Sequence, residues 1–332
     1  MILHKSGLNS IIFFLLICLS ACEEEDRFLG SDEFVSADQD IIEWRQNQNQ
    51  WIFNEMKNNY FWADRLLDST DYDYSLEPSL FFEEMLVKED RFSYCKLNEE
   101  YSDTKTIALN RSVLLDTVYQ ISNHRIGYLV YADFGSEADV TDVILKFKKV
   151  GITDLIIDLR NNPGGYVVTA IHLSSLIVPI KHLGKVFSKT RYNQRITAEI
   201  LNETGEVYDY DYFNDDYLTH QRNLNLGRVV MIVNGYSASC SELIVNCLKP
   251  YMEVFTIGER TVGKDVGMRS ISNRRYKYEL YPITFRTYNA VGDSVSIDGM
   301  IPNFEIKDYG ISEDGNQSEP LLKKALEYLI EN

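Results

Sequence analysis

The sequence predicts an α/β fold, because short apolar runs alternate with segments of helical periodicity across residues 117–332. Two of the runs, residues 154–159 and 229–233, are rich in Ile, Leu and Val, which is typical of buried strands. Between them and before them, apolar residues recur at helical spacing, as in residues 137–148 and 166–176. The resulting order β-α-β-α-β-β-α-β is that of an α/β sandwich.

The chain begins with features of an exported lipoprotein. Lys5 precedes an apolar core at residues 11–19, which is too short to cross a bilayer but has the length of a signal-peptide core. Residues 19–22 resemble a bacterial lipoprotein cleavage box, so we predict a signal peptide at 1–21 and lipidation of Cys22. Residues 22–39 then form an acidic linker, and acyl chains on Cys22 would anchor the protein to a membrane.

Residues 40–95 are predicted to form a small helical domain. An apolar stripe with polar residues between its members recurs at intervals of three, four and seven, and we assign it to a core: Trp44, Trp51, Ile52, Met56 and Tyr60. A second helix begins near Leu80. Residues 96–116 form a connector that is too short to bury a core of its own.

The core from residue 117 onward is assigned in chain order. We predict a strand at 125–131, the helix at 137–148, the strand at 154–159 with its glycine turn, the helix at 166–176 and a strand at 177–180. A polar, tyrosine-rich excursion at 192–225 is predicted to be a hairpin or lid. Two strands within 276–288 meet at Pro282, and an amphipathic helix covers 319–330.

A serine and a lysine follow neighbouring strands of this core. Residues 229–233 end in a small-residue turn, residues 237–242, that leads into a helix and contains Ser239. A second apolar run at 254–257 ends in a glycine-containing loop that carries Lys264. A lysine can deprotonate a serine only if burial keeps its amine neutral. On residue types alone, a tight turn and a solvated lysine explain the same pattern.

The stretch 229–267 resembles the signature of the carboxyl-terminal processing, or tail-specific, proteases. The turn at 237–242 matches the Ser-Ala-Ser-Ala-Ser-Glu-like pattern of that family, and Lys264 follows Ser239 at the family interval of 25 residues. The resemblance implies a crotonase-like (ClpP/crotonase) αβ protease core in which Ser239 is the nucleophile and Lys264 the general base. The Asp-Leu-Arg-x-Asn-x-Gly-Gly-like loop at 158–165 implies an oxyanion hole formed by the N–H of Gly164 or Gly165 together with that of Cys240.

The chain departs from the family pattern in three places. Residues 96–115 stand where most members carry a PDZ domain, so we predict that this domain is lacking. Met268 occupies the position of a glutamine that orients the lysine in many relatives, and Pro250 replaces an acidic residue found in some. Methionine cannot hold an amine as an amide does. A non-catalytic peptide-binding lipoprotein on the same scaffold is therefore the alternative function, and a glycan-associated structural lipoprotein is a third.

Other catalytic arrangements fit the sequence less well. Cys240 as nucleophile lacks a nearby histidine, and a triad through His172 would leave the serine–lysine interval unexplained. Cys240 and Cys247 lie about 10 Å apart along one helix, too far for a disulfide, so we expect Cys95, Cys240 and Cys247 to be free, buried thiols.

The composition limits the partners. The formal net charge is −17 and no basic run occurs, which argues against nucleic-acid binding. No metal or organic cofactor is implied. The expected partners are a peptide or protein substrate and a membrane reached through the lipid anchor. The expected location is the cell envelope, as an outer-membrane lipoprotein facing the periplasm or the cell surface.

Overall fold

The computed structural model describes residues 31–97, 111–310 and 315–332, with side chains from residue 39 onward. It divides into two units, residues 1–44 and 45–332. The predicted signal peptide and Cys22 lie outside the described residues. Helix α1 (Ser31–Asn59) begins inside the predicted linker, where residues 31–39 contain no Pro or Gly to prevent a helix. None of the helices in the described ranges is long and apolar enough to span a bilayer.

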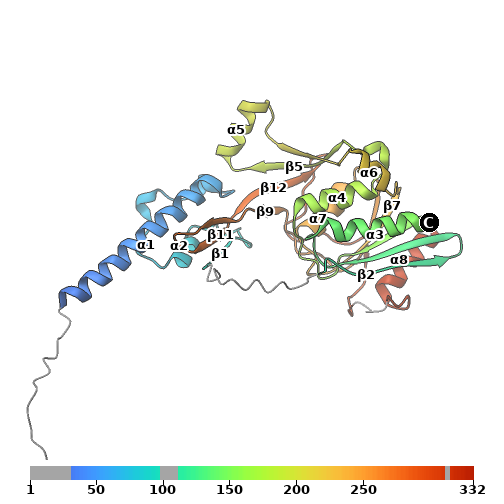
Figure 1. Cartoon of the computed structure of the whole chain (residues 1–332), viewed down its shortest axis with the longest axis horizontal. Coiled ribbons are helices and arrows are strands. Elements are labelled where there is room, and N and C mark those ends of the chain that lie inside the picture. The colour runs from blue at the N-terminus through green and yellow to red at the C-terminus, as the bar shows by residue number, and fades with distance from the viewer. Residues whose placement is uncertain (1–30, 98–110, 311–314) are drawn as a thin grey trace, which may run out of the picture. The chain divides into compact units, whose positions relative to one another are not determined.

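A six-stranded sheet forms the centre of the second unit (Figure 1). Its strands, in spatial order, are β13 (Phe304–Glu305), β8 (Glu253–Gly258), β7 (Arg228–Val233), β4 (Asp154–Asp158), β3 (His124–Tyr131) and β2 (Val113–Ile121). Strands β3, β4, β7, β8 and β13 are parallel, and β2 pairs antiparallel with β3. The carboxyl ends of β4, β7 and β8 therefore meet at one edge of the sheet, as the α/β prediction requires. The strand that opens this sheet starts at Val113, slightly before the predicted boundary at 117.

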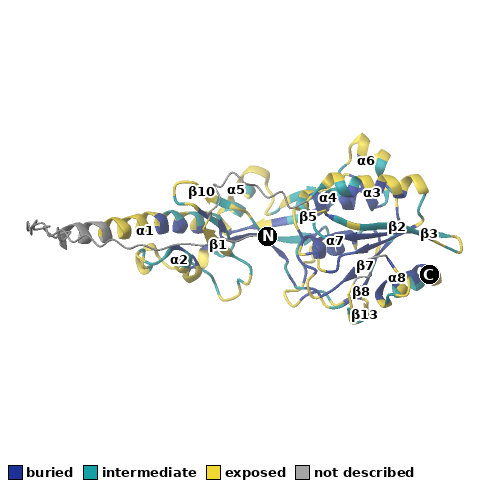
Figure 2. Cartoon of the chain, turned by 60° about the horizontal axis from the view of Figure 1, so that its bottom comes forward, coloured by how far each residue is buried: buried dark blue, intermediate teal, exposed yellow. Residues whose placement is uncertain are grey.

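Helices cover both faces of this sheet. Helices α3 (Glu137–Val150), α4 (Val167–Ile177) and α7 (Cys240–Leu248) contribute to one apolar core, and α8 (Pro320–Glu331) contributes to another. Figure 2 shows α8 on the opposite side of β7 and β8 from α3 and α4. Successive residues of β4 divide between the two cores, Leu155 and Ile157 on one face and Ile156 on the other.

A second, four-stranded sheet contains β6 (Asp209–Tyr212), β5 (Val186–Tyr192), β12 (Ile283–Asn289) and β9 (Val266–Met268). The predicted strand at 177–180 is wrong: α4 continues to Ile177, and a 3₁₀ turn (Ile180–His182) follows. Short apolar runs do not distinguish a buried helix end from a strand.

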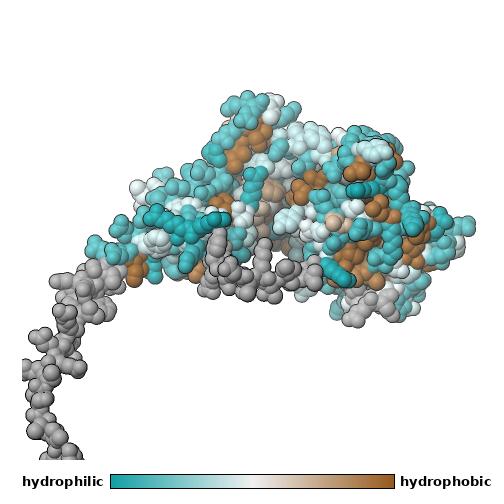
Figure 3. Space-filling view, in the orientation of Figure 1, coloured by the Kyte–Doolittle hydropathy of each residue, from teal (hydrophilic) through white to brown (hydrophobic). Residues whose placement is uncertain are grey.

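The predicted hairpin at 192–225 is realised in part. Strands β5 and β6 pair antiparallel, with α5 (Gln194–Thr204) between them and α6 (Tyr217–Arg222) after them. Helix α5 fully buries none of its side chains, and Figure 3 shows apolar residues gathered over it. The excursion is therefore a hairpin with a helical insertion.

The N-terminal helices pack on a third sheet. Strand β1 (Tyr94–Leu97) pairs with β11 (Tyr278–Tyr281), which pairs with β10 (Ile271–Asn273), and α2 (Pro78–Glu84) lies beside them (Figure 1). Two 3₁₀ turns, Ala63–Arg65 and Ser69–Asp71, link α1 to α2. The predicted stripe residues Ile52, Met56 and Tyr60 are fully buried, whereas Trp44 is exposed and belongs to the first unit.

This arrangement joins the N-terminal region to strands near the end of the chain. The core that holds Ile52, Met56 and Tyr60 also contains Val266, Leu280 and Ile283. Pro282 separates β11 from β12, as predicted. The N-terminal helices are therefore packed against the segment that directly follows Lys264.

Candidate active site

The serine turn projects Ser239 in a conformation that non-glycine residues rarely adopt. Ser239 precedes α7 with φ 56° and ψ −115°. Such strain persists only where neighbouring groups fix the backbone, and it occurs often at functional sites. Here the Ser237 hydroxyl donates to the carbonyl of Leu159 at 2.8 Å, and the N–H of Ala238 donates to the carbonyl of Asn162 at 3.1 Å. The turn after β7 is thereby tied to the loop after β4.

The glycine loop provides backbone donors beside Ser239. The N–H of Gly164 is already engaged, because it donates to the side-chain oxygen of buried Asn162 at 2.9 Å. Among the described residues no partner accepts from the N–H of Gly165 or of Cys240. The sequence did not decide between Gly164 and Gly165 as the oxyanion donor. In the structure, Gly165 is the glycine whose N–H is free, and the N–H of Cys240 is free as well.

The role of Gly164 is to leave space for the turn that carries Ser239. A Cβ at this position would lie 2.7 Å from the Cβ of Ser239 and 2.9 Å from the nitrogen of Cys240, and its φ is 105°. No other residue type fits this position without displacing the serine turn.

The lysine loop is held by Glu242, whose role the sequence did not reveal. This carboxylate is fully buried on α7. One oxygen accepts from the N–H of Gly263 at 2.7 Å and from the hydroxyl of Thr261. The other accepts from the N–H of Ser239 at 3.0 Å and from the N–H of Lys264 at 2.8 Å. Glu242 thus connects the backbones of the two predicted catalytic residues; the available signal was an acid three residues after a helix-capping serine.

The Lys264 side chain is half-buried. Burial lowers its pKa below the ordinary lysine value, and the nearby Cys240 and Glu242 offset this only in part. Its Nζ lies 5.3 Å from the ring centre of Phe92. Within the described ranges Nζ has no hydrogen-bond partner, and no hydrogen bond joins it to the Ser239 hydroxyl.

Ser239 and Lys264 line one cavity of about 580 Å³. Met268 lines it as well, so the position of the family glutamine does face the site. Apolar and aromatic residues contribute to the lining, among them Tyr166, Leu243, Phe285 and Val295.

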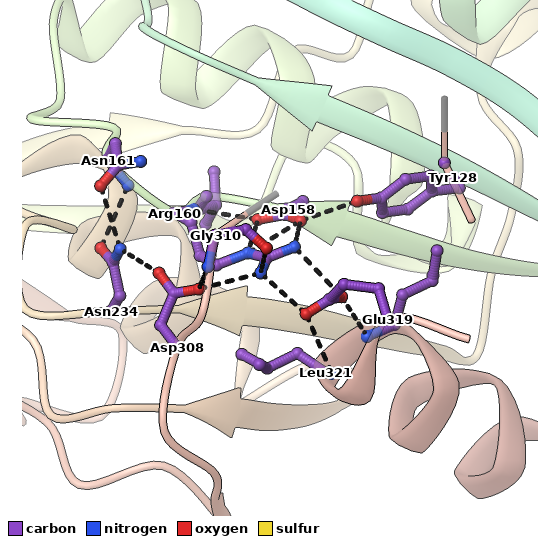
Figure 4. A network of polar contacts seen from close by, with 12 residues as sticks. Tyr128, Asp158, Arg160, Asn161, Asn234, Asp308, Gly310, Glu319 and Leu321 are labelled. Carbon is purple, nitrogen blue, oxygen red and sulfur yellow. Dashed lines mark hydrogen bonds and ion pairs between the residues drawn. The ribbon is translucent and has the colours of Figure 1, made fainter. Parts of the chain in front are cut away.

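A buried ionic network surrounds Arg160, which follows the end of β4 (Figure 4). Arg160 is fully buried in its side chain and pairs with Asp158 at 2.6 Å, and with Asp308 and Glu319 at 3.1 Å each. Burial alone would lower the pKa of Arg160, but the hydrogen bonds and charge of Asp158 raise it, so the guanidinium stays charged. The network joins the end of β4 to the start of α8.

The alternative nucleophile and triad find little support in the geometry. Burial raises the pKa of the Cys240 thiol to about 12, and its Sγ donates to the carbonyl of Gly165 at 3.2 Å. His172 forms a hydrogen bond with Thr141 at 2.7 Å and does not line the cavity of Ser239. All three described cysteines are free, as expected, although Cys95 is only partly buried.

Comparison with solved structures supports the fold. The chain is similar to a candidate S41 protease from Bacteroides fragilis, with a TM-score of 0.70 and 17% identity over 85% of this chain and 97% of that one. It is also similar to a lipoprotein from Streptococcus agalactiae, with a TM-score of 0.56, 12% identity, and 86% and 96% of the two chains covered.

Sequence comparison reaches curated relatives. The chain is 25% identical over 218 residues to the tail-specific protease of Haemophilus influenzae, which covers 60% of this chain and 28% of that protein. It is also 25% identical over 168 residues to a candidate CtpA-like serine protease of Staphylococcus aureus, with 50% and 30% of the two proteins covered. The chain thus spans only about 30% of the length of these relatives.

Two family profiles match consecutive parts of the chain. The N-terminal domain of S41 peptidases matches residues 47–94, and peptidase family S41 itself matches residues 125–306. The second match covers more than half of the chain and includes both Ser239 and Lys264. This protein belongs to peptidase family S41.

Proposed function

We propose that the chain is a serine endopeptidase in which Lys264 deprotonates Ser239. The observation that carries the proposal is the buried carboxylate of Glu242, which fixes the backbones of both residues at the rim of one cavity. The lowered pKa of Lys264 supports it, because a neutral amine is what a general base requires.

The reaction proceeds through an acyl-enzyme. Neutral Lys264 takes the proton of the Ser239 hydroxyl as Oγ bonds to the peptide carbonyl carbon. The resulting oxyanion accepts hydrogen bonds from the N–H groups of Gly165 and Cys240. The C–N bond then breaks as Lys264 returns the proton to the leaving amine. Water, deprotonated by the same lysine, attacks the ester, and Ser239 leaves with its proton restored.

The substrates are extended or unfolded peptides. An extended chain can pair with a strand edge near the site, and the apolar lining of the cavity offers contacts for its side chains. The crotonase-like topology of the core, the lack of a PDZ domain at 96–116 and the domain boundaries predicted above remain part of this proposal. Anchoring through lipidated Cys22 in the cell envelope is likewise proposed from the sequence.

A second function is a peptide-binding lipoprotein with weakened chemistry. Met268 lines the cavity where an orienting amide would lie, and Lys264 Nζ lacks a hydrogen-bond partner among the described residues. Both observations indicate that the Lys264 amine is held less firmly than it would be with a glutamine side chain beside it. Membership of a peptidase family does not favour this alternative.

Cleavage of fluorescein-labelled casein by the purified chain tests the proposal. Activity that is lost in Ser239→Ala and in Lys264→Ala supports the dyad. If the parent chain binds casein without cleaving it, the peptide-binding function replaces the peptidase. Activity that survives Ser239→Ala would mean that another nucleophile is used.

A further inference from the structure

The segment between α2 and β1 lies against the lysine loop. The Arg91 guanidinium donates to the carbonyl of Gly263 at 3.0 Å and to the carbonyl of Ile297 at 2.8 Å. The next residue, Phe92, places its ring centre 5.3 Å from the Nζ of Lys264. These contacts join residues more than 170 positions apart, and they involve the loop residues directly at the base.

The segment itself is fixed from the N-terminal side. The Asp90 carboxylate accepts from the N–H of Phe92 at 3.0 Å and from that of Ser93 at 2.9 Å, and it also accepts from the Tyr60 hydroxyl at 2.8 Å. Ser93 in turn accepts from the N–H of Ile283 on β12 at 2.7 Å. The backbone around Phe92 is therefore held from both sides.

We infer that Phe92 is a positioning residue for Lys264, and that Arg91 holds the lysine loop against it, so that the N-terminal domain completes the active site. The inference rests on the proposed function, in which Lys264 is the base. Residue 268 is a methionine and offers no amide to hold the Lys264 amine. Among the described residues, the Phe92 ring is the group that limits the position of the amine on the side of the N-terminal domain. It excludes water from the amine, and its face limits where the amine can lie.

Several charged and titratable groups near Lys264 also influence the pKa of its amine. Glu242 and Cys240 act on it from α7, and Arg91, on the same segment as Phe92, binds the carbonyl of the neighbouring Gly263. Asp265 follows it in the loop and is paired with Arg286 of β12 at 3.0 Å. Of these groups, Arg91 also lies over the Phe92 ring, with its Cζ 4.9 Å from the ring centre, so a substitution at Phe92 removes that contact as well.

The Phe92 ring has two opposite effects on the pKa of Lys264, and two variants at Phe92 separate them. Water exclusion lowers the pKa of Lys264, whereas the π face favours the ammonium form. Phe92→Leu keeps apolar cover and removes the π face, so the acid limb of kcat/KM stays in place or moves to lower pH. Phe92→Ala removes both, so water reaches the amine and the acid limb moves to higher pH, by about one unit. At neutral pH, Phe92→Ala lowers kcat and leaves KM nearly unchanged.

Phe304→Ala is the matched control. Lys324 Nζ lies 4.8 Å from the Phe304 ring centre on β13, so this variant also removes a phenylalanine–lysine contact. Neither Phe304 nor Phe92 lines the cavity, and the two rings differ in the lysine that they contact, Lys324 for Phe304 and Lys264 for Phe92. We expect its pH profile to match that of the parent chain.

The experiment measures the pH dependence of kcat/KM for the full chain and the three variants, together with the titration of Lys264. The titration uses ¹³C NMR of reductively ¹³C-methylated protein, with the Lys264 signal assigned by Lys264→Arg. An upward shift in Phe92→Ala and none in Phe304→Ala supports the inference. Unchanged Lys264 titration and an unchanged profile in both Phe92 variants overturn it.

The titration also separates this inference from the proposed function. If the parent chain cleaves nothing, or if Lys264→Ala still cleaves, the dyad fails, but a Lys264 signal that shifts in Phe92→Ala still establishes the positioning contact. If cleavage depends on Lys264 and neither Phe92 variant changes the titration, the dyad stands and the positioning role is wrong.

Discussion

Glu242 and Lys264 are joined by a hydrogen bond of 2.8 Å from the lysine N–H to the buried carboxylate. The same oxygen accepts from the N–H of Ser239 at 3.0 Å. A single side chain on α7 thereby sets the distance between the turn after β7 and the loop after β8. The Glu242 carboxylate accepts from the backbone N–H groups of Ser239 and Lys264 and not from Oγ or Nζ, so it is a positioning group.

Glu242→Gln should weaken both the structure and the chemistry. An amide nitrogen cannot accept the bonds that one carboxylate oxygen now accepts, and leaving buried N–H groups unpaired costs about 1–3 kcal/mol in unfolding free energy. The Glu242 charge raises the pKa of Lys264, so its removal should also move the acid limb of kcat/KM to lower pH. Urea unfolding and pH–rate profiles measure these effects. The exposed Glu199→Gln serves as control, and an unchanged acid limb would contradict the prediction.

Lys264 should make stability depend on pH in a defined direction. Its pKa is lower in the folded chain than in the unfolded chain, where it is about 10.4, so the unfolded state binds the proton more tightly. Folding therefore carries a penalty that is absent above the unfolded pKa, grows as pH falls toward the folded pKa and is constant below it. Lys264→Met should be more stable than the parent at pH 7, with an advantage that shrinks toward pH 10. Urea unfolding at both pH values checks this; an advantage that grows with pH would be the wrong sign.

Gly164→Ala should strongly slow cleavage, because the new Cβ would meet the Cβ of Ser239 at 2.7 Å. A fall in kcat of at least about 100-fold is expected, since oxyanion donors act only when correctly placed. Gly205→Ala is the matched control: its φ is also positive, at 78°, but nothing lies within 4 Å of the new Cβ. The control should lose about 1–2 kcal/mol of stability and keep its activity. Equal activity of the two variants would show that the contact at Gly164 is unimportant.

The three described cysteines, Cys95, Cys240 and Cys247, should resist alkylation in the folded chain. Burial raises the pKa of Cys240 and of Cys95 to about 12, and that of Cys247 well above its ordinary value. Only the thiolate reacts quickly, so iodoacetamide at pH 8 should label these three thiols slowly without urea and rapidly with it. Mass spectrometry of the labelled peptides measures the rates. Rapid inactivation through Cys240 would revive it as a nucleophile.

Arg160→Met should destabilise the chain strongly. It leaves the carboxylates of Asp158, Asp308 and Glu319 without their common cation, and removing one partner from a buried ion pair costs about 3–5 kcal/mol. Arg195→Met breaks an exposed pair with Glu199 and should cost less than about 1 kcal/mol. Urea denaturation of both variants measures the difference. Similar losses in the two would mean that the buried network contributes little.

Local sequence patterns predicted the parts of the fold that depend on local packing. The strands β4 and β7 and the helices α3, α4 and α8 were found because apolar spacing reports which face of an element is buried. The error at 177–180 has the same origin, because the apolar end of α4 has no periodicity that separates it from a strand. The apolar stripe of the N-terminal helix was also recognised. The sheet on which it packs was not, because β1 pairs with β11 across about 180 residues of sequence.

The sequence by itself determined the residue types and the interval that place a serine and a lysine after adjacent parallel strands. Only the tertiary structure decided which neighbours make that pair usable. Asn162 engages the N–H of Gly164 and leaves that of Gly165 free, Glu242 ties Ser239 to Lys264, and Phe92 reaches the base from the N-terminal region. These are contacts between distant segments, and burial and hydrogen bonding depend on what the folded chain brings together, which residue spacing does not encode.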